Sequence, residues 1–149
     1  MLRRLPILAL TLLAGCSLLA SDADRGAVGP VVFSLPVLDL DGDGPAEPQR
    51  FLIVQTEASY NCLLPLAADL DVDGSRLLVE IEGIAEVSAC ATAIGPARAD
   101  FPLSLADGTY TLTIEHLGRL DRYRIELHDE DLTVTTLEAE VSRYEASEG

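Results

Sequence analysis

Two short stretches of the chain place three aspartates at alternate positions and follow the third with a glycine. The first runs from residue 39 to residue 44 and the second from residue 69 to residue 74. Carboxylate oxygens are the ligands that a hard cation such as Ca²⁺ prefers, and glycine permits the sharp turn of a loop that wraps around the ion. Calcium is therefore the one specific ligand that these residues suggest.

The second stretch resembles the calcium loop of the EF-hand family. The resemblance implies four ligands, which are Asp69, Asp71, Asp73 and, at the twelfth position of the loop, Glu80. The first stretch, with Asp39, Asp41 and Asp43, fails at the twelfth position, because Arg50 stands there. A calcium-binding module that uses the acidic loop 69–80 is thus an alternative function for the chain.

The surroundings of the second stretch favour a β-hairpin. Arg76 replaces the usual apolar eighth residue, Leu77 replaces the usual polar ninth residue, and no flanking helix is predicted. An Asp-Gly pair is also a common hairpin turn, which explains Asp73-Gly74 equally well. Such a hairpin would hold Glu80 outward, on the wrong side of a strand to meet Asp69. We therefore expect weak or absent calcium binding and no other cofactor.

Cys62 and Cys90 are the only cysteines in the body of the chain, and Cys16 lies near its start. If the chain is exported, as the N-terminal segment described below indicates, an even pair of cysteines is most simply a disulfide. Two cysteines and two histidines could also bind zinc, but the cysteines lack Cys-x-x-Cys spacing and the histidines lie apart from them. The sequence therefore favours a Cys62–Cys90 disulfide.

Catalysis has little support in the sequence. A Ser-His-Asp triad needs a histidine beside a nucleophile and an orienting acid. Local pairing would place His116 opposite Asp121, but no serine accompanies them, and His128 adjoins acids in what is predicted to be a solvated turn. No phosphate-binding loop, zinc signature or nucleophile elbow is found. We therefore expect a protein that is not an enzyme.

The N-terminal segment has the three parts of a secretory signal. Arg3 and Arg4 precede an apolar run from Leu5 to Leu13, and Ala14-Gly15 then leads into Cys16. Leu-Ala-Gly-Cys resembles the lipobox of bacterial lipoproteins, which implies cleavage of residues 1–15 and a Cys16 that carries diacylglycerol and an amide-linked fatty acid such as palmitate. An ordinary signal peptide with an incidental cysteine, or an uncleaved anchor, is the alternative.

The lipoprotein resemblance also implies a location in the cell. Several acyl chains make a stable membrane anchor. In bacterial lipoproteins, an aspartate directly after the lipidated cysteine favours the inner membrane. This chain has Ser17 at that position, which indicates the outer membrane. Residues 16–29 comprise the lipidated cysteine and a mostly small and polar segment, which predicts a flexible tether. Residues 30–149 would then form one domain in the periplasm or at the cell surface.

The charge of the chain excludes one class of partner. The full sequence carries 25 acidic residues, ten arginines and no lysine, for a net charge of −15. Without residues 1–15, which hold two of the arginines and no acid, 25 acids face eight arginines and the charge is −17. Such a surface repels nucleic acid and anionic lipid headgroups. The expected partners are the membrane, through the lipid anchor, and an envelope protein or extracellular ligand.

The pattern of apolar residues in the body of the chain predicts a series of short strands. Apolar residues alternate from Val31 to Val37 and from Leu77 to Ile81, and residues 51–54 form an apolar run that suits a central strand. Residues 97–105 and 132–134 are further candidates. This spacing of strands and turns predicts an all-β fold, a single antiparallel β-sandwich that is immunoglobulin-like or related, with a small barrel as the alternative.

The clearest hairpin spans residues 109–128. A type II′ turn at Gly118-Arg119 would put apolar residues on one face and oppositely charged residues on the other. This register pairs Leu117 with Leu120, Glu115 with Arg122, Thr113 with Arg124, Ile114 with Tyr123, Leu112 with Ile125, and Tyr110 with Leu127. The sequence as a whole thus predicts a membrane-anchored envelope lipoprotein whose β-sandwich has a non-catalytic binding or structural role.

Overall fold

The structure is a computed structural model of the chain, and it describes residues 28–38, 48–89, 92–129 and 131–146. The predicted signal peptide 1–15, Cys16, Cys90 and the acidic stretch 39–44 lie outside the described residues, so the expectations for them stay predictions. The described residues contain no helix that is long and apolar enough to cross a membrane.

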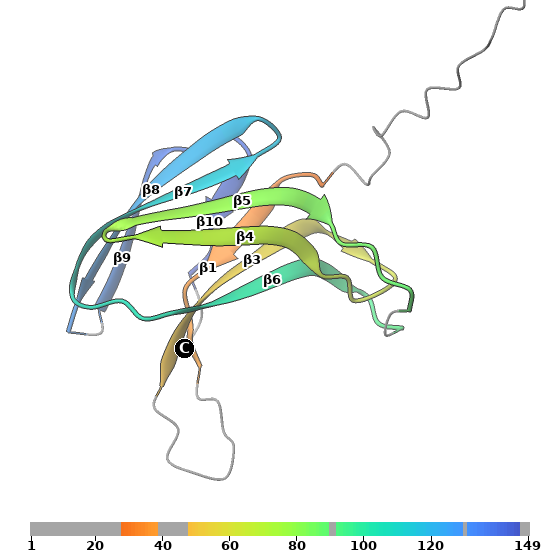
Figure 1. The fold of residues 1–149 in the computed structure, drawn as a ribbon, viewed down its shortest axis with the longest axis horizontal. Coiled ribbons are helices and arrows are strands. Elements are labelled where there is room, and N and C mark those ends of the chain that lie inside the picture. Colours follow the sequence, from red (N-terminus) through yellow and green to blue (C-terminus); the bar gives the residue numbers. More distant parts are fainter. Residues whose placement is uncertain (1–27, 39–47, 90–91, 130, 147–149) are drawn as a thin grey trace, which may run out of the picture.

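Ten strands are described, and they form two five-stranded sheets that pack face to face (Figure 1). Their bounds are β1 Val31–Ser34, β2 Val37–Leu38, β3 Gln49–Tyr60, β4 Leu66–Asp73, β5 Arg76–Ile84, β6 Gly95–Leu103, β7 Gly108–His116, β8 Arg119–His128, β9 Asp131–Glu138 and β10 Ser142–Tyr144. The predicted all-β sandwich is confirmed. The immunoglobulin-like relationship stays a prediction.

One sheet is built around the long strand β3. Strands β1 and β2 pair with one edge of β3, β6 pairs with the other edge, and β10 pairs with β1. The second sheet has the order β4-β5-β7-β8-β9. Pairing is antiparallel except between β1 and β10 and between β5 and β7, which run parallel. The predicted central strand at residues 51–54 is confirmed, since β3 has neighbours on both sides.

The core lies between the sheets and follows the two-residue period of the strands. Strand β8 shows this most clearly, because every second side chain from Asp121 to Leu127 is buried while its neighbours are exposed. Phe33 and Tyr123, one from each sheet, meet edge to face with ring centroids 4.6 Å apart. Burial of alternate residues on both inner faces is the driving force expected for a sandwich.

The β7–β8 hairpin has a different register from the predicted one. His116 pairs with Arg119 and Ile114 pairs with Asp121, which moves every predicted partner by two residues. The turn is made by Leu117 and Gly118, whose φ angles of 53° and 70° are those of a type I′ turn. Glycine therefore takes the second central position of the turn, not the first. A shift of two residues keeps each side chain on its predicted face.

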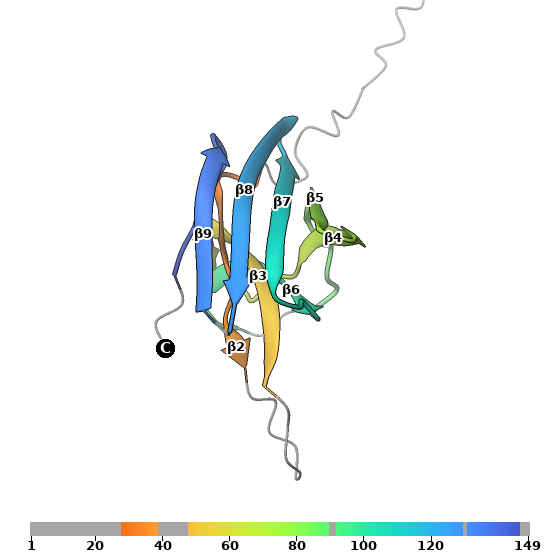
Figure 2. The same ribbon diagram turned by 90° about the vertical axis from the view of Figure 1, so that its left-hand side faces the viewer.

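Strand directions give the sandwich two distinct ends (Figures 1 and 2). We call the end where the described chain begins at Val28 the proximal end. The β7–β8 turn lies there, since the His116 side chain contacts the Val28 carbonyl. The opposite, distal end holds the start of β3 at Gln49, the β6–β7 connection and the β8–β9 turn.

Candidate functional site

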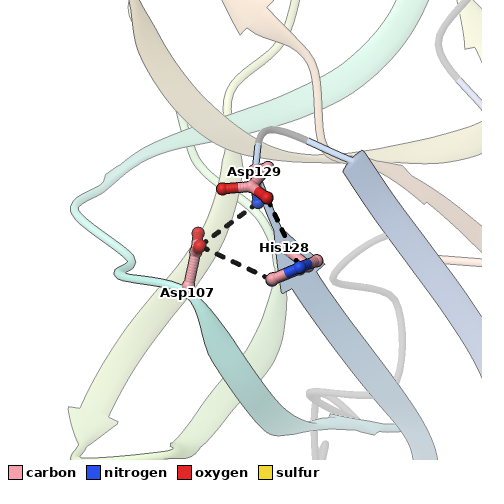
Figure 3. A group of neighbouring side chains, drawn as sticks. All are labelled: Asp107, His128 and Asp129. Atoms are coloured by element: carbon pink, nitrogen blue, oxygen red, sulfur yellow. Dashed lines mark hydrogen bonds and ion pairs between the residues drawn. The ribbon is translucent and has the colours of Figure 1, made fainter.

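The distal end carries a group of three side chains that face one another (Figure 3). Asp107 precedes β7, His128 ends β8, and Asp129 follows in the turn to β9. The imidazole Nδ1 lies 3.7 Å from Asp107 Oδ2, and Nε2 lies 3.4 Å from Asp129 Oδ2. The Asp129 backbone N–H donates to Asp107 Oδ2 at 3.2 Å.

Two interactions can hold these three side chains together. A protonated His128 would form ion pairs with both aspartates. Alternatively, a metal ion could take one ligand atom from each, because the three atoms lie within 4.8 Å of one another. All three side chains are more than half exposed, so water competes for every contact. The geometry permits a weak metal site and requires none.

The predicted hairpin register does not bring these three residues together, whereas the observed register does. In the observed pairing, the position opposite His128 on β7 is that of Asp107, one step before the strand begins. The predicted register would instead have placed Thr109 opposite His128 and residue 130 opposite Asp107. A correct turn assignment would therefore have found the His128–Asp107 pair from the sequence.

A cleft of about 840 Å³ opens beside Asp107 at the distal end. Its walls come from both sheets, with Val37, Leu103 and Leu127 as apolar contributors and Gln49 as a polar one. Clefts of this volume with mixed walls are the usual places where proteins bind small molecules or peptide side chains. The cleft is therefore a described feature of the distal end that could take a ligand.

A second polar group lies inside the fold and involves Asp121, which is only 1% exposed. Its carboxylate accepts the backbone N–H groups of Glu140, Val141 and Ser142 at 2.6–2.9 Å. The Ser142 hydroxyl also donates to Asp121 at 2.6 Å, and Tyr123 Oη lies 2.8 Å from Ser142 Oγ. Asp121 thus fixes the crossover that carries the chain from β9 in one sheet to β10 in the other.

The surroundings of Asp121 keep it ionised. Burial raises the pKa of its carboxyl, but the Ser142 hydroxyl and the three backbone N–H groups together bring the pKa below the ordinary 3.8. Tyr123 responds in the opposite direction, because burial and the Asp121 charge raise the pKa of its hydroxyl. These groups serve structure, since a substrate could not reach them.

His116 is also buried, at the proximal end. Its Nε2 lies 3.1 Å from the Val28 carbonyl oxygen and 2.9 Å from that of Gly29. Carbonyls only accept hydrogen bonds, so Nε2 carries the proton. Nδ1 is buried and has no hydrogen-bond partner among the described residues. The predicted pairing of His116 with Asp121 is wrong, because the register places Arg119 opposite His116.

The four predicted calcium ligands lie on the β4–β5 hairpin, which confirms the hairpin expectation, although the predicted turn at Asp73-Gly74 is wrong by one residue because Asp73 is itself paired. The turn is formed by Gly74 and Ser75, between the paired residues Asp73 and Arg76. Glu80 pairs directly with Asp69, so the two share the outer face of the sheet, and our expectation that a strand would separate them is wrong.

The four carboxylates are kept apart by the distances along the extended strands, and not by lying on opposite faces of the sheet. Asp69 and Asp73 are four residues apart on β4, which corresponds to about 13 Å along an extended strand. Within the described part of the chain, no three of these four carboxylates gather within 4.8 Å. They cannot enclose one ion without unpairing the hairpin.

We expect the melting temperature of the domain to be unchanged by millimolar calcium. A ligand stabilises a fold only in proportion to its preferential binding to the folded state, and the strand offers no preformed calcium cage. Differential scanning calorimetry with and without the ion measures this. A micromolar affinity that Asp71→Ala abolishes would contradict the expectation.

No known protein-family model, curated protein sequence or solved structure matches this chain significantly. Cys62 lies in the bend after β3, whereas Cys90 is outside the described residues, so their disulfide stays a prediction.

Proposed function

We propose that the chain is a lipid-anchored protein of the cell envelope whose non-catalytic β-sandwich presents a ligand-binding surface at the distal end. The observation that carries the proposal is the Leu-Ala-Gly-Cys sequence at residues 13–16, directly after a basic and an apolar segment. An acylated Cys16 would hold the protein in the outer membrane by its lipid.

The layout of the sandwich supports this arrangement. The described chain begins at Val28 at the proximal end, twelve residues after Cys16, while the cleft and the Asp107–His128–Asp129 group lie at the distal end. A tether attached at one end of a domain leaves the opposite end accessible to a partner. The domain would therefore extend its cleft away from the membrane that holds it.

The chemistry of the described residues supports a non-catalytic role. The exposed histidine, His128, has the carboxylates of Asp107 and Asp129 beside its two ring nitrogens. The buried group around Asp121 is occupied by hydrogen bonds that hold the backbone. A binding or structural role uses the fold without requiring either group to react. The net charge of −15 supports a partner other than nucleic acid.

Calcium binding by residues 69–80 is the weaker candidate. The three aspartates and Glu80 of the motif are all present. To surround one ion, however, they would have to give up their pairing in an intact antiparallel hairpin. The calcium measurement described above separates it from the favoured function.

We expect mass spectrometry of the protein from the membrane fraction to show an N-terminal cysteine that carries diacylglycerol, with residues 1–15 removed. Cys16→Ser should leave the precursor uncut or release the domain from the membrane, because the thiol that receives the lipid is lost. Ser21→Ala is the matched control, since it changes one residue of the predicted tether and leaves Cys16 and the other cysteines available. An intact Met1, or cleavage at another site, would contradict the proposal.

A further inference from the structure

Exposed apolar side chains are gathered toward one end of the sandwich. Among the large hydrophobic residues described as exposed, two lie toward the distal end, Val37 and Val72. The others lie on strands or loops toward the proximal end, and they are Leu63, Val87, Ile94, Leu117, Leu120 and Leu137. The proximal end thus carries most of the exposed large apolar side chains among the described residues.

Two of these leucines lie at the β7–β8 hairpin end, Leu117 in the turn itself and Leu120 near the start of β8. Leu117 is 56% exposed and Leu120 is 54% exposed, so neither side chain is explained by packing in the core. Turn geometry does not explain Leu117 either. Its φ of 53° lies in the left-handed region, where a type I′ turn favours asparagine, aspartate or glycine. Leucine is the poorer choice there for both solubility and conformation.

The turn lies beside the point where the described chain begins. His116, the last residue of β7, contacts the backbone carbonyls of Val28 and Gly29 through its Nε2. Val28 is twelve positions after Cys16, so the two residues can lie at most about 40 Å apart along an extended chain. A bilayer that holds Cys16 would therefore be within reach of the turn.

We infer that residues 117–120 form a membrane-contacting tip that inserts Leu117 and Leu120 into the lipid surface in which Cys16 is anchored. The inference rests on the proposed lipid anchor. The anchor supplies attachment, and the tip would set orientation by holding the proximal end against the bilayer. The cleft would then point away from it.

Charges around the tip define the kind of lipid surface it fits. Arg119 is paired with Glu140 at 3.0 Å, and Glu115 is exposed on the adjoining strand. The tip therefore offers no spare positive charge to an anionic headgroup, and the net charge of the chain is strongly negative. Zwitterionic headgroups such as phosphatidylcholine avoid this repulsion.

The sequence contains no tryptophan, so a single introduced tryptophan reports on one position. We would reconstitute the full lipidated protein in phosphatidylcholine vesicles that contain brominated acyl chains, as the variants Leu117→Trp and Leu120→Trp. Val37→Trp is the matched control, because Val37 is also about half exposed but lies at the distal end. Bromine quenches tryptophan only at close range.

We expect at least threefold stronger quenching and a blue-shifted emission for both tip variants relative to Val37→Trp. Adding anionic lipid at low ionic strength should reduce the difference. Equal quenching of all three variants, in protein that is lipidated and bound to vesicles, would refute the membrane-contacting tip. The proposed lipid anchor would not be affected by that result. A blue shift with no bromine quenching, together with dimers in solution, would overturn it in favour of self-association. Absence of the lipid in mass spectra would instead refute the proposed function, and with it the inference.

Discussion

Replacing Asp121 by alanine should lower the free energy of unfolding by about 3–5 kcal/mol. The substitution removes the acceptor of three backbone N–H groups and of the Ser142 hydroxyl, all at a site that water hardly reaches. Each donor left unsatisfied in the interior costs free energy. Urea denaturation at pH 7 measures the loss.

Asp71→Ala is the control for Asp121→Ala. Asp71 is exposed on the edge strand β4 of the same sheet, so its removal should change the unfolding free energy by no more than about 0.5 kcal/mol. Equal effects of the two substitutions would show that the crossover does not depend on Asp121.

The charge of Asp121 also gives its contribution a pH dependence. Its pKa in the folded state is below the ordinary 3.8, so the stabilisation is fully present above about pH 4 and is lost as the pH falls through the folded-state value. Asp121→Asn has no such titration. The stability difference between wild type and Asp121→Asn should therefore be constant near neutral pH and shrink below pH 4. A constant difference down to pH 2.5 would contradict this.

Loss of the predicted Cys62–Cys90 disulfide should cost roughly 3–4 kcal/mol in the chain-entropy model. The fold supports the pairing, because Tyr60 pairs with Gly95 and the Ala85 N–H donates to the Pro65 carbonyl at 3.0 Å. The chain segments that contain the two cysteines therefore begin and end side by side. The double variant Cys62→Ala/Cys90→Ala tests this by urea denaturation.

Reduction of the wild-type protein provides the control for the disulfide. If the bond forms, reduced wild type and the double variant should have the same stability, and non-reducing peptide mapping should recover the two cysteines linked. Two freely alkylated thiols in folded, exported protein would show that the pairing is wrong.

Local pattern was enough to predict the strands and their faces. Alternation on β8 assigns Tyr123, Ile125 and Leu127 to the core, and this assignment survives the wrong turn because a shift of two residues preserves the face. The turn itself was misassigned because Gly118 satisfies either of two turn types, and only the positive φ of Leu117 distinguishes them. The conformational preferences of single residues do not predict a leucine with a positive φ.

The partners of the buried polar groups could not be predicted from the local sequence pattern, because they lie far away in the sequence. Asp121 stands at a core-facing position of β8, so its burial could have been inferred from the alternation. Its partners, which lie about twenty residues further along the chain, could not. The same holds for the two parallel pairings, β1 with β10 and β5 with β7, because no short turn connects the strands and fixes their register.

The pairing of β1 with β10 joins the beginning and the end of the described domain. Strand β1 remains an open edge until Ser142–Tyr144 arrives, and the Phe33 ring then gains Tyr144 at a centroid distance of 5.4 Å. Contacts between residues so distant in sequence form late and slowly during folding. The described domain is therefore complete only once β10, its last described strand, has paired with β1.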